Sequence, residues 1–96
     1  MTAQPKEYLE FIRLFNAGEF FKSHEVLEGL WRKTEGEDKL FYHGLIQAAV
    51  SFHQASKGNR KGLQYERTKA REKLEKFPAR HLGVDVRKLL EDLERL

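Results

Sequence analysis

The stretch FFKSHEVLEGLW, residues 20–31, carries the side chains best suited to chemistry. At about 100° per residue of a helix, His24 lies in the middle of an apolar face, and Glu28 lies at its margin one turn later. Glu25 points away from that face. An imidazole and a carboxylate spaced in this way can bind one metal ion or act as an acid/base pair. They can also form a buried polar clasp that holds a helix in place.

A metal site needs more ligands than this pair supplies. The metal candidates are His24, Glu28 and, as a third ligand, His53. No spacing rule brings them together, and the chain lacks the second histidine of His-Glu-x-x-His and the paired Glu-x-x-His motifs of di-iron bundles. We therefore expect no metal and no cofactor. We favour the clasp, since leaving either group unpaired in a core costs about 1–3 kcal/mol.

Several polar or amphipathic groups nonetheless gather in a small predicted interior. Convergent polar groups in an apolar setting are typical of a ligand pocket. The candidate polar pocket consists of His24, Glu28, Trp31, Gln47 and His53. Their residue types identify neither a catalytic group nor a small-molecule ligand.

The apolar periodicity that must position these side chains is helical throughout, and no strand pair is credible. The predicted helices run over about residues 4–16, 19–33 and 38–57, then from Asn59 to Pro78, and finally over 85–96, with Asp85 as the cap of the last one. The helix over 38–57 is apolar on nearly all sides. We therefore expect it at the centre of an all-α bundle of about five helices.

Two details concern how the helices meet. Small residues at helical spacing form a strip along which another helix could approach closely; they are Gly44, Ala48, Ser51 and Ala55. Gly58 can close one helix while Asn59 caps the next, which predicts a tight antiparallel hairpin.

Arg67 falls on the inward stripe of the fourth helix. It could extend to the surface, which we favour, or reach the Glu28 carboxylate.

The bulk composition limits the class of protein. With 96 residues and no cysteine, residues 1–96 form a single predicted domain without disulfides or thiolate metal sites. The longest stretch without Asp, Glu, Lys or Arg, 40–56, is too short to span a membrane. We expect a cytoplasmic protein that does not enter membranes.

Positive charge is concentrated in one segment. The net charge of the chain is +3, but residues 57–81 contain nine Lys or Arg against three Glu. Glutamates interleaved at helical spacing make a solvated helix surface the simpler account. A phosphate-binding surface for RNA is the alternative, although no RNP-like or GXXG motif accompanies it.

Two motifs, FNAGEFFKSHEVLEGLWR and FYHGLIQAAVSFHQASKGNRKG, follow one another in the chain. In this order they resemble the prokaryotic family of small helical proteins known as domain of unknown function 309, and the resemblance spans roughly residues 8–77. The hallmark positions are Asn16, Gly18, Phe20, His24, Glu25, Glu28, Trp31, Gly44, Leu45, Ile46, Gln47, Gly58, Asn59 and Gly62. Leu63 stands where members usually have alanine, and His43 where glutamine is expected. The resemblance implies a helical bundle in which His24, Glu28, Trp31 and Gln47 are neighbours; it implies no reaction.

Three functional hypotheses follow. The preferred one is a non-catalytic binding or interaction domain that self-associates, with the buried His24–Glu28 pair holding the second and third helices in register. The alternative is a metal-dependent or acid/base, hydrolase-like enzyme that uses His24 and Glu28, with His53 as third group and Trp31 as a pocket wall. The third is RNA binding through residues 57–81.

Overall fold

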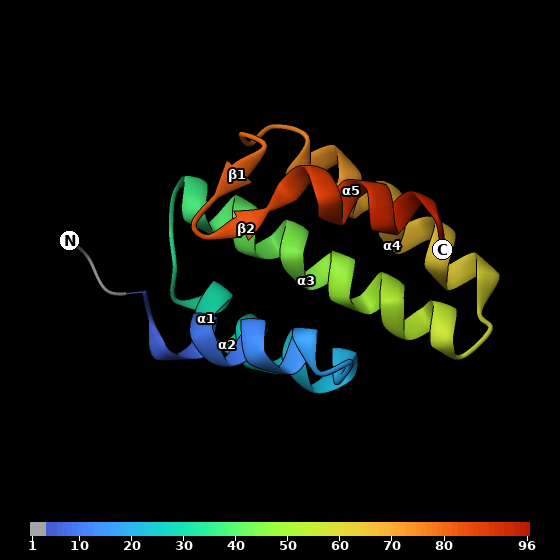
Figure 1. The fold of residues 1–96 in the computed structure, drawn as a ribbon. Helices are drawn as coiled ribbons and strands as arrows, with labels where there is room; N and C mark the ends of the chain where they lie inside the picture. Colours follow the sequence, from blue (N-terminus) through green and yellow to red (C-terminus); the bar gives the residue numbers. More distant parts are fainter. Residues whose placement is uncertain (1–3) are drawn as a thin grey trace.

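The computed structural model describes residues 4–96, which form five helices and one short hairpin (Figure 1). The elements are α1 (Lys6–Asn16), α2 (Phe20–Arg32), α3 (Glu37–Ser56), α4 (Arg60–Leu74), β1 (Arg80–His81), β2 (Val84–Asp85) and α5 (Val86–Glu94). The prediction of an all-α bundle of about five helices is confirmed. Within residues 4–96, none of the helices combines the length and the apolar character needed to cross a membrane.

Local signals account for the turn between α3 and α4 and for the start of α5. Gly58 takes a φ of 74°, a left-handed conformation that costs glycine little. The Asn59 side chain accepts a hydrogen bond from the backbone N–H of Gly62 at 3.0 Å and so caps α4. Asp85 caps α5 in the same way through the N–H of Lys88, also at 3.0 Å. Both predicted caps are confirmed.

α3 runs through the middle of the molecule, with α1 and α2 on one side and α4 and α5 on the other (Figure 1). It packs against α2, α4 and α5, and its central residues Phe41, Leu45 and Ala48 are at most 1% exposed. The other helices contribute one buried stripe each to the same core. The expected central position of the third helix is therefore confirmed.

α4 approaches α3 closely at one end of the strip of small residues. A Cβ atom added to Gly44 would lie 2.9 Å from Cδ2 of Leu74, closer than the roughly 3.5 Å at which carbon atoms attract. Ala48 and Ser51 lie further along the strip and are fully buried. The Ser51 hydroxyl donates to the carbonyl oxygen of Gln47 at 2.8 Å, so its burial leaves no unpaired donor.

Two expectations about the chain after α4 are wrong. α4 ends at Leu74, before the expected stop at Pro78. The following residues form an antiparallel hairpin of β1 with β2, where no strand pair was expected. Each strand has only two residues, which is too short for an alternating pattern to be visible in the sequence.

The hairpin turn depends on a contact from the other end of the chain. Leu82 takes a φ of 48°, which is uncommon for a bulky residue, and Gly83 follows with a φ of 80°. The buried Tyr8 hydroxyl on α1 donates to the carbonyl oxygen of Leu82 at 2.8 Å. This tertiary bond helps to hold a turn that no local signal predicts.

Candidate functional site

The candidate pocket residues lie along the seam between α2 and α3, which pack side by side in antiparallel orientation (Figure 1). At one end the Phe21 ring lies 5.2 Å from the His53 ring, and at the other the Trp31 ring lies 4.9 Å from the His43 ring. Ten residues of α2 separate these ends, roughly 15 Å of helix. The structure brings the predicted residues onto one seam and spreads them along it.

His24 and Glu28 do not form the predicted clasp. His24 is half-buried, and its Nδ1 lies 2.5 Å from the carbonyl oxygen of Phe21 in the same helix. The Glu28 side chain is 38% exposed and accepts a hydrogen bond from Arg32 at 2.7 Å. No hydrogen bond or ion pair within residues 4–96 joins His24 to Glu28, so the prediction of a buried pair is wrong. Arg32, four residues after Glu28, can neutralise that carboxylate at the surface without the cost of burying it.

The metal candidates do not share a ligand position. The Phe21 ring contacts both imidazoles, at 4.8 Å from His24 and 5.2 Å from His53. Among the residues that the structure describes, no group of three or more His, Cys, Asp or Glu side chains could hold a metal ion. This end of the seam is an aromatic–imidazole contact, with Phe21 half exposed.

The other end of the seam carries aromatic and basic groups. Lys39 on α3 places its Nζ 4.9 Å from the centroid of the Trp31 ring, and His43, one turn later, packs against the same ring. One further turn along α3, the Oε1 atom of Gln47 is buried without a hydrogen-bond partner among residues 4–96. His43 and Lys39 were not among the predicted site residues, although their spacing from Gln47 places all three on one side of α3.

Charged side chains of α4 lie near enough to the seam to interact electrostatically with its histidines. The sequence did not predict them there. Burial raises the pKa of Glu66, while Lys73, His24 and Lys69 oppose that rise. Burial also lowers the pKa of His43, and Lys73 lowers it further. The spacing of the three α4 residues puts them on one helix face. Which face turns toward the seam depends on tertiary packing alone.

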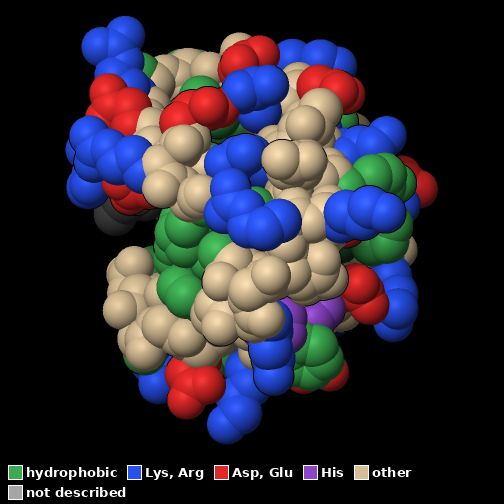
Figure 2. All heavy atoms as spheres, turned by 90° about the vertical axis from the view of Figure 1, so that its right-hand side faces the viewer, with side chains coloured by type: hydrophobic (Ala, Val, Ile, Leu, Met, Phe, Trp, Pro, Cys, Tyr) green, Lys and Arg blue, Asp and Glu red, His purple; other side chains and the backbone are tan. Residues whose placement is uncertain are grey.

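A separate groove of about 240 Å³ opens between α1 and α5. Figure 2 shows a hollow with hydrophobic side chains at its bottom, on the side of the molecule where these two helices lie. Its apolar lining residues are Phe11, Ile12, Phe15, Leu45, Val84 and Leu89. The groove was not predicted, because the helical residues among these also indicate ordinary core packing, and Val84 lies in a strand too short to be visible in the sequence.

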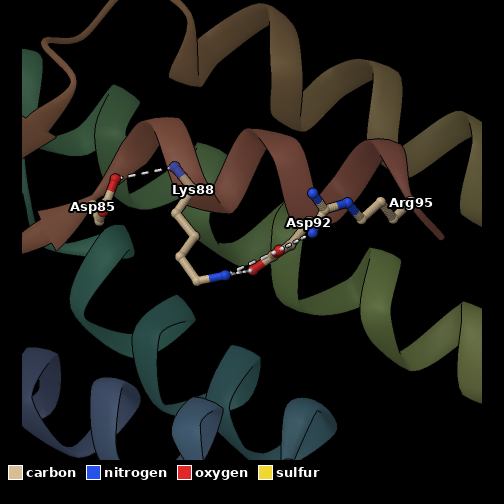
Figure 3. A network of polar contacts seen from close by, with 4 residues as sticks. All are labelled: Asp85, Lys88, Asp92 and Arg95. Carbon is tan, nitrogen blue, oxygen red and sulfur yellow. Dashed lines mark hydrogen bonds and ion pairs between the residues drawn. The ribbon is translucent and has the colours of Figure 1, made fainter.

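Charged groups at the rim of the groove neutralise one another (Figure 3). The Lys88 Nζ atom lies 3.4 Å from both carboxylate oxygens of Asp92, and Nη1 of Arg95 lies 3.8 Å from one of them. The Asp85 carboxylate caps α5 and lies 3.9 Å from Nη2 of Arg80. The rim therefore presents paired charges around an apolar floor.

The arginines of the basic segment 57–81 hold the C-terminal part of the chain. Their contacts are Arg60 Nη1 to the Leu96 carbonyl oxygen (3.1 Å), Arg67 Nη1 to the Leu93 carbonyl oxygen (3.2 Å), Arg71 to the Glu94 carboxylate, and Arg80 to the Asp85 carboxylate. Arg67 thus reaches the end of α5 and not Glu28. These contacts give the arginines a structural role, and RNA binding through the segment stays a prediction.

Fold and seam together define a small all-helical protein built around the His-Glu-x-x-Glu-x-x-Trp segment. A family model described as "Domain of unknown function (DUF309)" matches residues 8–65, a shorter range than the expected 8–77. The chain belongs to this family.

Two relatives support this assignment. The crystal structure of a conserved hypothetical protein from Thermus thermophilus matches with a TM-score of 0.79 and 36% identity, over 97% of this chain and 96% of that chain. An uncharacterized protein of Aquifex aeolicus (strain VF5) is 41% identical over 46 residues, which are 47% of this chain but only 14% of that longer protein. Neither description states an activity.

Proposed function

We propose that this protein is a non-catalytic interaction domain that forms a homodimer through the groove between α1 and α5. In the dimer, Leu9 of each copy inserts into the groove of the other. The observation that carries the proposal is the position of Leu9, a large apolar side chain that is 56% exposed beside an apolar groove.

Leu9 continues the edge of α1 that lines the groove. Ile12 follows three residues later and Asn16 seven residues later, and both line the groove. These spacings place the three side chains on one edge of the helix. Two α1 helices packed antiparallel about a two-fold axis near Ile12 bring each Leu9 toward the other copy's groove. Such a contact is the same in both directions and closes at two copies.

The chemistry of the groove suits an uncharged occupant. Because the rim carboxylates of Asp85 and Asp92 already have cationic partners, a docking segment needs no charge of its own. Burying one leucine side chain contributes about 1.5–3 kcal/mol. An interface centred on one short helix belongs to the small class that buries less than about 1,200 Å² in total, which is typical of weak complexes. We therefore expect a dimer that forms at concentrations of about 100 µM and above.

The seam supports a binding role over the hydrolase-like alternative. His24 Nδ1 is engaged by the Phe21 carbonyl oxygen and Glu28 by Arg32, both within α2. Both groups therefore already have hydrogen-bond partners in their own helix, which favours the binding role. A cytoplasmic location is part of the same proposal, and it rests on a composition without cysteine.

Sedimentation velocity over a range of about 10 µM to 1 mM tests the dimer. The wild-type protein should shift toward dimer with concentration, and Leu9→Ser should stay monomeric. Phe21→Ser is the matched control, because Phe21 is similarly exposed, at 50%, but lies on α2 away from the groove. A wild-type protein that is monomeric throughout, or a Leu9→Ser variant that dimerises like wild type, would refute the proposal.

A further inference from the structure

We infer that Trp31, Lys39, His43 and Lys73 form a binding site for a small aromatic molecule that carries a phosphate or carboxylate group. None of the four lines the groove of the proposed dimer. The two proposals can therefore be tested independently of each other.

Three helices bring these side chains together. Lys39 and His43 lie one turn apart on α3, and both contact the Trp31 ring of α2, each at 4.9 Å. Lys73 comes from α4, on the other side of α3. Its Cβ lies 3.2 Å from the position that a Cβ on Gly44 would occupy, so the lysine starts beside the residue that follows His43, and it lowers the pKa of His43. The absence of a side chain at Gly44 is what lets α4 bring Lys73 so near.

Positive charge accumulates in this cluster without a paired anion. No ion pair within residues 4–96 involves Lys39 or Lys73, although Glu72 and Glu66 lie near enough to affect the pKa of Lys73. Burial lowers the pKa of Lys73, and burial together with the two lysines lowers the pKa of His43. The Lys73 shift means that its positive charge is held here at a cost, and the His43 shift means that its ring stays neutral beside the two lysines. A bound phosphate or carboxylate would offset that cost through charge-assisted hydrogen bonds.

The indole ring determines the other half of the ligand. Trp31 is half-buried, so packing holds its side chain in place while part of that side chain stays exposed to solvent. The Lys39 amine lies over the ring, which shows that the indole can be approached by a group outside the core. A second aromatic ring would stack on or against the indole with a gain of about 0.5–1.5 kcal/mol beyond area burial. A ligand with a ring and an adjacent anionic group matches both features.

Trp31 is the only tryptophan of the chain, so its fluorescence reports on this site directly. Titration of the full chain with phenyl phosphate should produce a saturable change in emission. Phenol and inorganic phosphate, which each supply one half of the ligand, should bind at least about tenfold more weakly. Quenching should also favour iodide over caesium, because the potential beside the indole is positive.

Substitutions separate a specific site from the general basicity of the protein. Lys73→Gln should raise the Kd for phenyl phosphate about tenfold. Lys61→Gln is the matched control, since it removes the same charge from an exposed position on α4 and should change Kd less than about twofold. Equal weakening by both substitutions, or no saturable response of Trp31 to phenyl phosphate, would overturn the inference. If inorganic phosphate bound as tightly as phenyl phosphate, the inference that the ligand carries an aromatic ring would be wrong.

Discussion

Replacing Gly44 by alanine should destabilise the protein, although alanine is the better helix former. Gly44 lies inside α3, where the added methyl group would meet Leu74 at 2.9 Å and the Cβ atom of Lys73 at 3.2 Å. Leu74 is fully buried and cannot move into solvent. The Lys73 Cβ atom is attached directly to the backbone of α4, so the helix itself would have to shift.

The expected size of the effect comes from two opposing contributions. Alanine is favoured over glycine in a helix interior by about 1 kcal/mol. Inserting a methyl group into a packed core costs about 1–3 kcal/mol. We therefore expect Gly44→Ala to lower the free energy of unfolding by about 1 kcal/mol. Gly29→Ala in α2 is the matched control, because nothing lies within 4 Å of its added Cβ, and it should raise the free energy of unfolding by about 1 kcal/mol.

Urea unfolding followed by far-ultraviolet circular dichroism measures both variants. The two midpoints should move in opposite directions, with unchanged m-values if the transition stays two-state. A Gly44→Ala protein as stable as Gly29→Ala would refute the close approach of α3 and α4. It would also remove the reason for placing Lys73 beside His43.

Three further predictions concern single polar groups. Asn59→Ala should cost about 1 kcal/mol in urea unfolding, because it removes the cap of α4, and Asn59→Asp should retain most of that stability. Gln47→Met should raise the free energy of unfolding by about 1 kcal/mol, since it replaces a buried oxygen without a partner; a loss of stability would show that Oε1 is satisfied after all. The pKa of His43 is lowered from its ordinary value of 6.5 by burial, Lys73 and Lys39, so the neutral ring favours the folded state. Its contribution should be complete above about pH 6.5 and lost as the pH falls through the folded-state pKa, and a His43→Gln variant should show a smaller loss of stability over that interval.

Much of the fold is predictable because its determinants are local. The expected ends of α1, α2 and α3 agree with the structure to within two residues, since glycine turns and apolar stripes involve only near neighbours in the chain. The caps at Asn59 and Asp85 are also predictable, because each bonds a backbone N–H only three residues later. The hairpin after α4 does not, because Leu82 takes its positive φ with support from Tyr8 at the far end of the chain.

The candidate site was predictable only in part. Periodicity correctly puts Trp31 on the packed face of α2, where its ring meets His43 of α3, and it places Glu25 in solvent. It could not show that Glu28 pairs with Arg32 or that His24 bonds within its own helix, since alternative partners for a half-exposed group differ by about 1 kcal/mol or less.

The sequence by itself determined the number of helices, most of their ends and which helix is central, because these depend on backbone propensities and on the balance of apolar and polar faces within each segment. Only the tertiary structure decided which polar side chains meet. The rotation of α4 about its own axis brings Lys73 close to Gly44 and His43, and the separation of α1 from α5 leaves a groove beside Leu9. Both depend on how side chains from different helices pack, which no single segment of the chain encodes.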